Sequence, residues 1–191
     1  LVSSDFGKTL TLDGVTINSF GVFNELNDTN QSQIDGIGVF CHEFSHCLGL
    51  PDFYPTNGTS YFGMDVWSLM DYGCYNDDGY TPVGYTAYEK SYFGWIDLEE
   101  AADNQHYTLP AMNAGDRSTD RAVKVTNPKN SNEYFILENR ARHGWDAYIP
   151  AEGMLITHVN YSQTRWDANT VNNTRTQGMT IIPADNALTV S

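Results

Sequence analysis

The chain is short and acidic. Its 191 residues are 40% hydrophobic and 13% aromatic, which suits one folded domain with a core. The 24 Asp and Glu residues outnumber the 10 Lys and Arg residues and give a formal net charge of −14. Such a surface repels phosphate groups and anionic lipids, so we expect no nucleic acid partner. No run of about 18 apolar residues occurs, and we expect no membrane insertion.

The start of the chain and its cysteines carry further information. The chain begins with Leu1, and no charged segment followed by an apolar stretch comes after it. We therefore expect a piece of a longer product, with any export signal upstream. Cys41, Cys47 and Cys74 are too few for a disulfide framework, and we expect buried, unreactive thiols.

A hairpin and a helix are the first elements expected along the chain. Residues 9–12 and 15–17 alternate around the turn Asp13-Gly14, a pattern typical of a hairpin. Asp35 is the expected N-cap of the helix, and Gly49 marks its end. Apolar residues recur at the helical period and predict one buried stripe, made of Ile37, Phe40, Cys41, Phe44, Cys47 and Leu48.

The remaining elements are a loop, a second helix and several strands. Residues 53–80 are rich in Gly, Asn, Asp and Tyr and predict a loop. The second helix is expected to begin with Thr81 as N-cap and Pro82 in its first position, and to end at Gly94. Strands are expected at 106–110, 122–126, 134–138, 154–159 and 179–182. This order indicates the α+β class.

The sequence HEFSH at 42–46 carries the main chemical signal. His42 and His46 are four residues apart, so their imidazoles lie on one helix face, away from the apolar stripe. Two neutral imidazoles at this spacing can both bind one Zn²⁺ ion. Glu43 is rotated about 100° around the helix, too far for a third ligand. It is placed to accept a proton from a water molecule at the metal.

Asp52 is the expected third ligand. Gly49 allows the backbone to reverse after His46, which can carry the Asp52 carboxylate back to the metal. A helix that simply continued would take Asp52 about 9 Å farther along the axis. Two histidines and one carboxylate leave a coordination position open, which is typical of catalytic rather than structural zinc sites.

Longer motifs resemble a known family. The run HEFSHCLGLPDFY at 42–54 resembles the metzincin zinc motif in its variant ending in Asp, as in the immune inhibitor A-type peptidases of bacteria. The sequence WSLMDYG at 67–73 is similar to the Met-turn that lies beneath the zinc in metzincins. Segments 133–140, 144–146 and 153–159 resemble later strands of the same family, so the resemblance covers roughly residues 9–185.

This resemblance implies a metzincin-like fold and a secreted zinc endopeptidase that cleaves internal peptide bonds of proteins or peptides. It implies that the two histidines and Asp52 bind Zn²⁺ and that Glu43 is the general base. Met70 would form a hydrophobic floor under the metal without ligating it. Tyr72, two residues later, would steady the oxyanion.

The resemblance also predicts how the chain is organised. Residues 1–100 would form the zinc-binding catalytic core, and residues 101–191 a β-rich C-terminal subdomain of the same peptidase unit. Only 41 residues precede His42, which leaves room for a cleft-edge strand at 15–22. The N-terminal subdomain is therefore expected to be incomplete.

Three alternatives remain open at this point. The chain could be a non-catalytic zinc-binding or adhesion module, or an incomplete remnant of a peptidase. Glu89 on the second helix could be the third ligand of a different HExxH hydrolase. Separately, the sequence NDDG at 76–79 could bind Ca²⁺ through carboxylate and carbonyl oxygens, or form a plain solvated turn.

Overall fold

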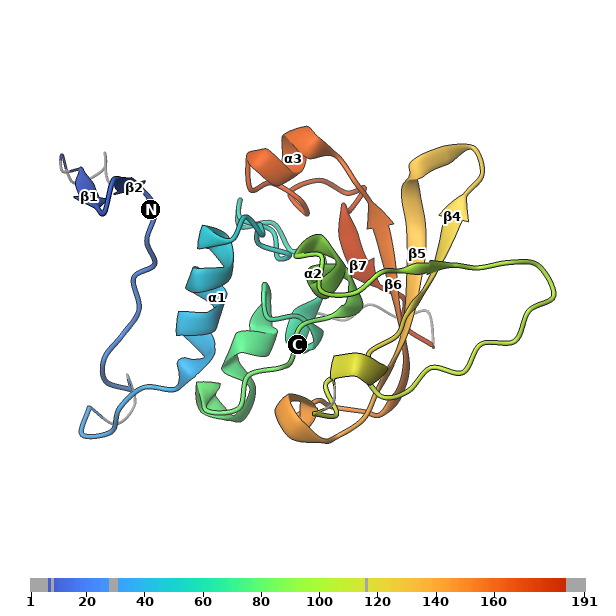
Figure 1. The fold of residues 1–191 in the computed structure, drawn as a ribbon, viewed down its shortest axis with the longest axis horizontal. Helices are drawn as coiled ribbons and strands as arrows, with labels where there is room; N and C mark the ends of the chain where they lie inside the picture. The colour runs from blue at the N-terminus through green and yellow to red at the C-terminus, as the bar shows by residue number, and fades with distance from the viewer. Residues whose placement is uncertain (1–6, 8, 28–30, 116, 185–191) are drawn as a thin grey trace.

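The computed structural model describes residues 7, 9–27, 31–115 and 117–184. Both helices and sheets are present, which confirms the α+β class (Figure 1). With η marking 3-10 helices, the elements are β1 (Leu10–Leu12), β2 (Val15–Ile17), α1 (Ile37–Cys47), η2 (Asp65–Trp67), η3 (Tyr72–Gly79), α2 (Ala87–Tyr92), β3 (Glu99–Glu100), η4 (Arg117–Thr119), β4 (Val123–Asn127), β5 (Asn130–Arg140), η5 (Gly144–Asp146), β6 (Gly153–Asn160), α3 (Gln163–Asp167) and β7 (Met179–Ile181).

β1 and β2 form the predicted hairpin, with Leu12 paired to Val15. The turn residues Asp13 and Gly14 have φ angles of 50° and 79°, as a two-residue type I′ turn requires. The hairpin projects from the body of the molecule (Figure 1). β2 ends at Ile17, so the cleft-edge strand expected over 15–22 forms only in its first part and pairs with β1.

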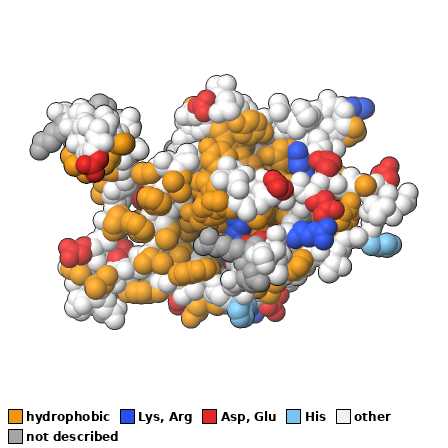
Figure 2. Space-filling view, in the orientation of Figure 1, with side chains coloured by type: hydrophobic (Ala, Val, Ile, Leu, Met, Phe, Trp, Pro, Cys, Tyr) orange, Lys and Arg blue, Asp and Glu red, His pale blue; other side chains and the backbone are white. Residues whose placement is uncertain are grey.

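α1 spans the predicted residues but presents an unexpected face to the protein. Its buried residues are Gly38, His42 and Ser45. A Cβ atom on Gly38 would lie 1.8 Å from the Cys74 carbonyl oxygen, so the glycine lets α1 approach η3 closely. The prediction of a buried apolar stripe was therefore wrong, and four of its side chains are 42–51% exposed: Ile37, Phe40, Phe44 and Leu48. Figure 2 shows apolar side chains gathered over α1.

The ends of the predicted helices need two corrections. Gly36, not Asp35, is the N-cap of α1, and the Asp35 carboxylate accepts a hydrogen bond from the Gly36 amide. The second helix, α2, begins after Thr86 rather than Thr81, because a capping box between Thr86 and Glu89 fixes its start. Its C-terminal end agrees with the prediction, since Gly94 adopts a positive φ of 70° just beyond it.

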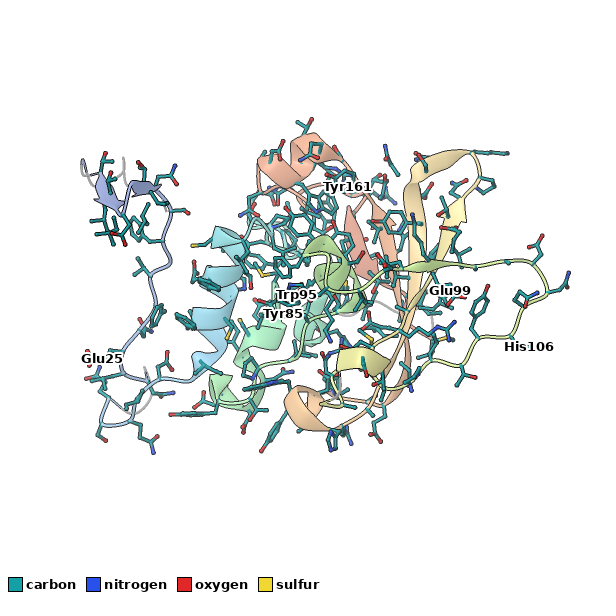
Figure 3. All side chains as sticks on the ribbon, in the orientation of Figure 1. Glu25, Tyr85, Trp95, Glu99, His106 and Tyr161 are labelled. Atoms are coloured by element: carbon teal, nitrogen blue, oxygen red, sulfur yellow. The ribbon has the colours of Figure 1, made fainter. Side chains whose placement is uncertain are left out.

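The five-stranded sheet has the order β3-β4-β5-β6-β7. Only the short pair β3–β4 is parallel, and the remaining neighbours are antiparallel. Four of the five predicted strands are confirmed as β4 to β7, whereas residues 106–110 form no strand. Figure 3 places His106 on a loop that projects beyond the sheet, on the side away from α1. β3 and α3 were not predicted.

The hydrophobic core connects the sheet to the segments that follow α1. Fully or nearly fully buried side chains come from these segments, from α2 and from β5, β6 and β7, and include Phe53, Met70, Ala87, Tyr88, Ile136, Val159 and Met179. Figure 1 shows α2 and the intervening loops between α1 and the sheet. None of the helices in the described ranges has the length and apolar character needed to span a membrane.

Candidate metal centre

The two α1 histidines are held by backbone carbonyls. His42 Nδ1 lies 2.8 Å from the Leu69 carbonyl oxygen, and His46 Nδ1 lies 2.7 Å from that of Leu50. Because a carbonyl oxygen only accepts, each Nδ1 must carry the proton and donate it. Each Nε2 atom is then left to face the site, and the rings lie edge to face with centroids 4.8 Å apart. Such backbone partners orient imidazoles for metal binding.

The chain reverses at Gly49, as the sequence predicts. Gly49 has a φ of 103°, and its amide donates to the His46 carbonyl oxygen at 3.0 Å. This turn brings the Asp52 carboxylate back to the histidines. Asp52 Oδ1 lies 3.1 Å from His42 Nε2 and 3.2 Å from His46 Nε2.

These three side chains have the composition and placement of a metal site. Their ligand atoms lie within 4.8 Å of one another, and Asp52 Oδ1 is buried without a hydrogen-bond partner. Lone pairs this close need a positive charge among them, which is either a metal ion or a proton on an imidazole. The donor set therefore fits a divalent metal ion. No second cluster of this kind occurs in the part of the chain that the structure describes.

The electrostatics of the site favour a cation. Burial by itself raises the pKa of Asp52, but the two imidazoles and the Asn169 amide outweigh it and hold this pKa well below its usual value. Burial lowers the pKa of His46, yet Asp52 and the Leu50 carbonyl outweigh that effect and raise it. Burial and the nearby Asp52 charge raise the pKa of Tyr54, whose ring stacks against His42 at 6.4 Å.

Asn169 is the contact that the sequence did not reveal. Its Oδ1 accepts a hydrogen bond from the Asp52 amide, and its Nδ2 donates to Asp52 Oδ2, both at 2.7 Å. The two residues are 117 positions apart, and only the fold brings them together. Asn169 itself has a positive φ of 52°, a weak sequence signal because asparagine tolerates this conformation.

The other expected site residues lie around the same centre. Glu43 and Tyr72 line a cavity of about 180 Å³ together with His42 and Tyr54. Glu43 is half-buried, whereas Tyr72 is 58% exposed. Met70 is fully buried in the core beside the turn whose Leu69 carbonyl holds His42.

The alternative ligands are bonded elsewhere. Glu89 is fully buried, and its Oε1 accepts a hydrogen bond from the Ser68 hydroxyl at 2.6 Å, away from the histidines. At 76–79, the Asp77 carboxylate accepts from the Thr81 hydroxyl at 2.7 Å, and the Asp78 carboxylate accepts from an asparagine amide. Nothing in this arrangement supports a calcium site.

Comparison with known proteins finds one similar family. The family model described as "Immune inhibitor A peptidase M6, catalytic domain" matches residues 6–96, the region that contains the histidines and Asp52. Residues 6–96 are therefore similar to the catalytic domain of the immune inhibitor A peptidases. Immune inhibitor A peptidases are metallopeptidases, which implies a metal, and a His–His–Asp cluster is present in the matched region.

Two curated proteins are also similar to the chain. Both are pre-pro-metalloprotease PrtV of Vibrio cholerae serotype O1, from strains M66-2 and ATCC 39315 / El Tor Inaba N16961. Each is 30% identical over 142 residues, which cover 65% of this chain and 15% of the relative. The chain thus spans a small part of these relatives. No solved structure matches it significantly.

Proposed function

We propose that the chain carries the active site of a secreted zinc endopeptidase that hydrolyses internal peptide bonds of proteins or peptides. The observation that carries this proposal is the convergence of His42 Nε2, His46 Nε2 and Asp52 Oδ1 within 4.8 Å. Two imidazoles and one carboxylate are a common zinc donor set with a coordination position left open. The name of the relatives, pre-pro-metalloprotease, is consistent with export.

In this proposal His42, His46 and Asp52 hold the ion. When bound, zinc supplies Lewis acidity, which polarises the scissile carbonyl and makes a water molecule more acidic. The Leu69 and Leu50 carbonyls keep the imidazoles in the tautomer with Nε2 free. The chain therefore presents a site that is already oriented before substrate arrives.

Glu43 is the proposed general base. It follows His42 on α1 and lines the same cavity, where it can accept a proton from the attacking water and return it to the leaving amine. Tyr72 lines this cavity too, and its hydroxyl is proposed to donate a hydrogen bond to the developing oxyanion. Met70 is proposed as the apolar floor beneath the ion.

The two regions 1–100 and 101–191 are proposed to form one peptidase unit. Asn169 belongs to the C-terminal region, and it hydrogen-bonds Asp52 of the N-terminal region on both its amide and its carboxylate. A metal ligand in one region is thus supported by a side chain of the other.

Glu43→Ala is the direct test of the proposed mechanism. We expect it to lower cleavage of a fluorogenic casein by at least about 100-fold, the usual contribution of a general base. Its zinc content, measured by mass spectrometry of the dialysed protein, should match that of the parent. Asp97→Ala, which removes an exposed acid between α2 and β3, is the control and should cleave normally.

The outcomes separate this proposal from the non-catalytic module. Loss of cleavage by the parent in the presence of a strong zinc chelator would support a zinc peptidase. A parent that binds zinc but shows no chelator-sensitive cleavage would favour the zinc-binding module or the remnant. Full activity of the Glu43→Ala variant would remove Glu43 from its role.

A further inference from the structure

Three asparagines lie in the turn that follows α3. They connect this turn to the segment at 52–56. Asn169 bonds Asp52, and Asn172 Nδ2 donates to the Phe53 carbonyl oxygen at 2.7 Å. Asn173 Oδ1 accepts a hydrogen bond from the Thr56 amide, also at 2.7 Å. We call Asn169, Asn172 and Asn173 the asparagine turn. The side chains of Asn172 and Asn173 bond only backbone or hydroxyl groups, as any structural cross-link could do.

Asn169 differs because it contacts the charged group of an expected ligand. Its side-chain nitrogen Nδ2 donates a hydrogen bond to Asp52 Oδ2, and its side-chain oxygen Oδ1 accepts one from the Asp52 backbone amide. With one oxygen occupied and the backbone fixed, Oδ1 is the carboxylate oxygen that faces both imidazoles. Asp52 is only 5% exposed, so water has little access to replace Asn169 in this role.

We infer that Asn169 is a positioning residue for the metal centre, selecting the Asp52 oxygen that ligates and holding it toward the histidines. This inference rests on the proposed function, since it takes His42, His46 and Asp52 as the zinc ligands. Without the Asn169 side chain, Asp52 Oδ2 would lose the amide donor, and the Asp52 backbone amide would lose its acceptor, that together fix the orientation of this carboxylate. Partners of this kind orient ligating groups and so strengthen metal binding.

Asn169→Gly is the most informative variant, because glycine accepts the positive φ of 52° without strain. We expect it to bind Zn²⁺ about 10- to 100-fold more weakly than the parent, measured by competition with a chromophoric chelator. The visible absorption of the Co²⁺-loaded protein should also change, because it reports the ligand geometry directly. Asp52→Ala serves as the reference for complete loss of the ligand.

Asn173→Ala is the matched control. It removes a hydrogen-bonded cross-link with the same separation of 117 residues, but one that reaches Thr56 instead of a ligand. We expect its zinc affinity and its Co²⁺ spectrum to equal those of the parent. Thermal melting of the metal-free proteins will show whether the two variants differ in folding.

The possible results decide between a positioning role and a structural one. Parent-like zinc affinity and spectrum in Asn169→Gly would overturn the inference, and so would equal weakening in both variants. Should Asn169→Gly fail to fold, Asn169→Ser replaces it, because one short hydroxyl cannot reach both Asp52 groups, and the same weakening is expected. A parent that binds no zinc would remove the proposed metal site and this inference with it.

Discussion

The Arg140 guanidinium is completely buried in β5, between two carboxylates. Its Nη1 lies 2.9 Å from Glu138 Oε1, and its Nε lies 2.8 Å from Asp146 Oδ2. A further bond reaches the Gly84 carbonyl oxygen at 3.1 Å. Both carboxylates have additional backbone donors, since Ala87 donates to Glu138 and Gly84 donates to Asp146. These neutral donors do not replace the cation, so removing it would leave two buried carboxylates with no opposite charge.

Arg140→Ala should therefore lower the free energy of unfolding by about 3–5 kcal/mol, the usual cost of breaking a buried ion pair. Arg121→Ala is the control, because Arg121 pairs with Glu99 at the surface, where both side chains are more than 40% exposed. Exposed pairs contribute about 0.2–1 kcal/mol. Urea unfolding followed by circular dichroism measures both values, and equal losses would show that burial of Arg140 does not control stability.

At the scale of elements, periodicity predicts where a helix lies better than which face it buries. The apolar positions of α1 recur with the correct period, but Gly38 decides the packing by allowing contact with the Cys74 carbonyl. The predicted start of α2 was also wrong, because a contact within the fold fixes it at a later residue. Thr81 and Pro82 form a plausible helix start by themselves, whereas the capping box of Thr86 and Glu89 competes successfully with them.

Phe44 and Phe53 give a direct test of the exposed α1 face. Phe44 is 51% exposed and stacks on Phe40, while Phe53 is completely buried in the core. We expect Phe53→Ala to lower the free energy of unfolding by about 3–5 kcal/mol, because it creates a cavity in the core. The free energy of unfolding of Phe44→Ala should stay within about 0.5 kcal/mol of that of the parent, as for most surface substitutions. A cost for Phe44→Ala as large as that of Phe53→Ala would mean that this face is covered.

The part of the candidate site whose residues lie close together in the chain could be predicted from the sequence. The histidines, Glu43 and Asp52 lie within eleven positions, so helical geometry and one glycine turn suffice to place them. The Leu69 carbonyl and the Asn169 amide come from distant segments. Such contacts depend on how the core packs, for which a single sequence offers no local signal.

On the scale of the whole molecule, the candidate metal centre joins segments that are far apart in the chain. α1 supplies two of the candidate ligands, and the following turn supplies Asp52. The contacts to Leu69 and Asn169 attach the segment around Leu69 and the turn after α3. A metal ion bound here would stabilise all of these segments together, because an ion that binds only the folded state adds its binding free energy to folding.

Removal of zinc should consequently lower the thermal stability of the entire chain. A free zinc concentration of 100 times Kd adds about 2.7 kcal/mol to the free energy of unfolding. For a chain of this size that corresponds to a rise in Tm of roughly 5–11 °C, at about 2–4 °C per kcal/mol. Differential scanning calorimetry of the parent with zinc and with a chelator measures this shift. His42→Ala should melt at the same temperature under both conditions, because it lacks one ligand. A parent whose Tm does not respond to zinc would contradict the assignment of a metal to these three side chains.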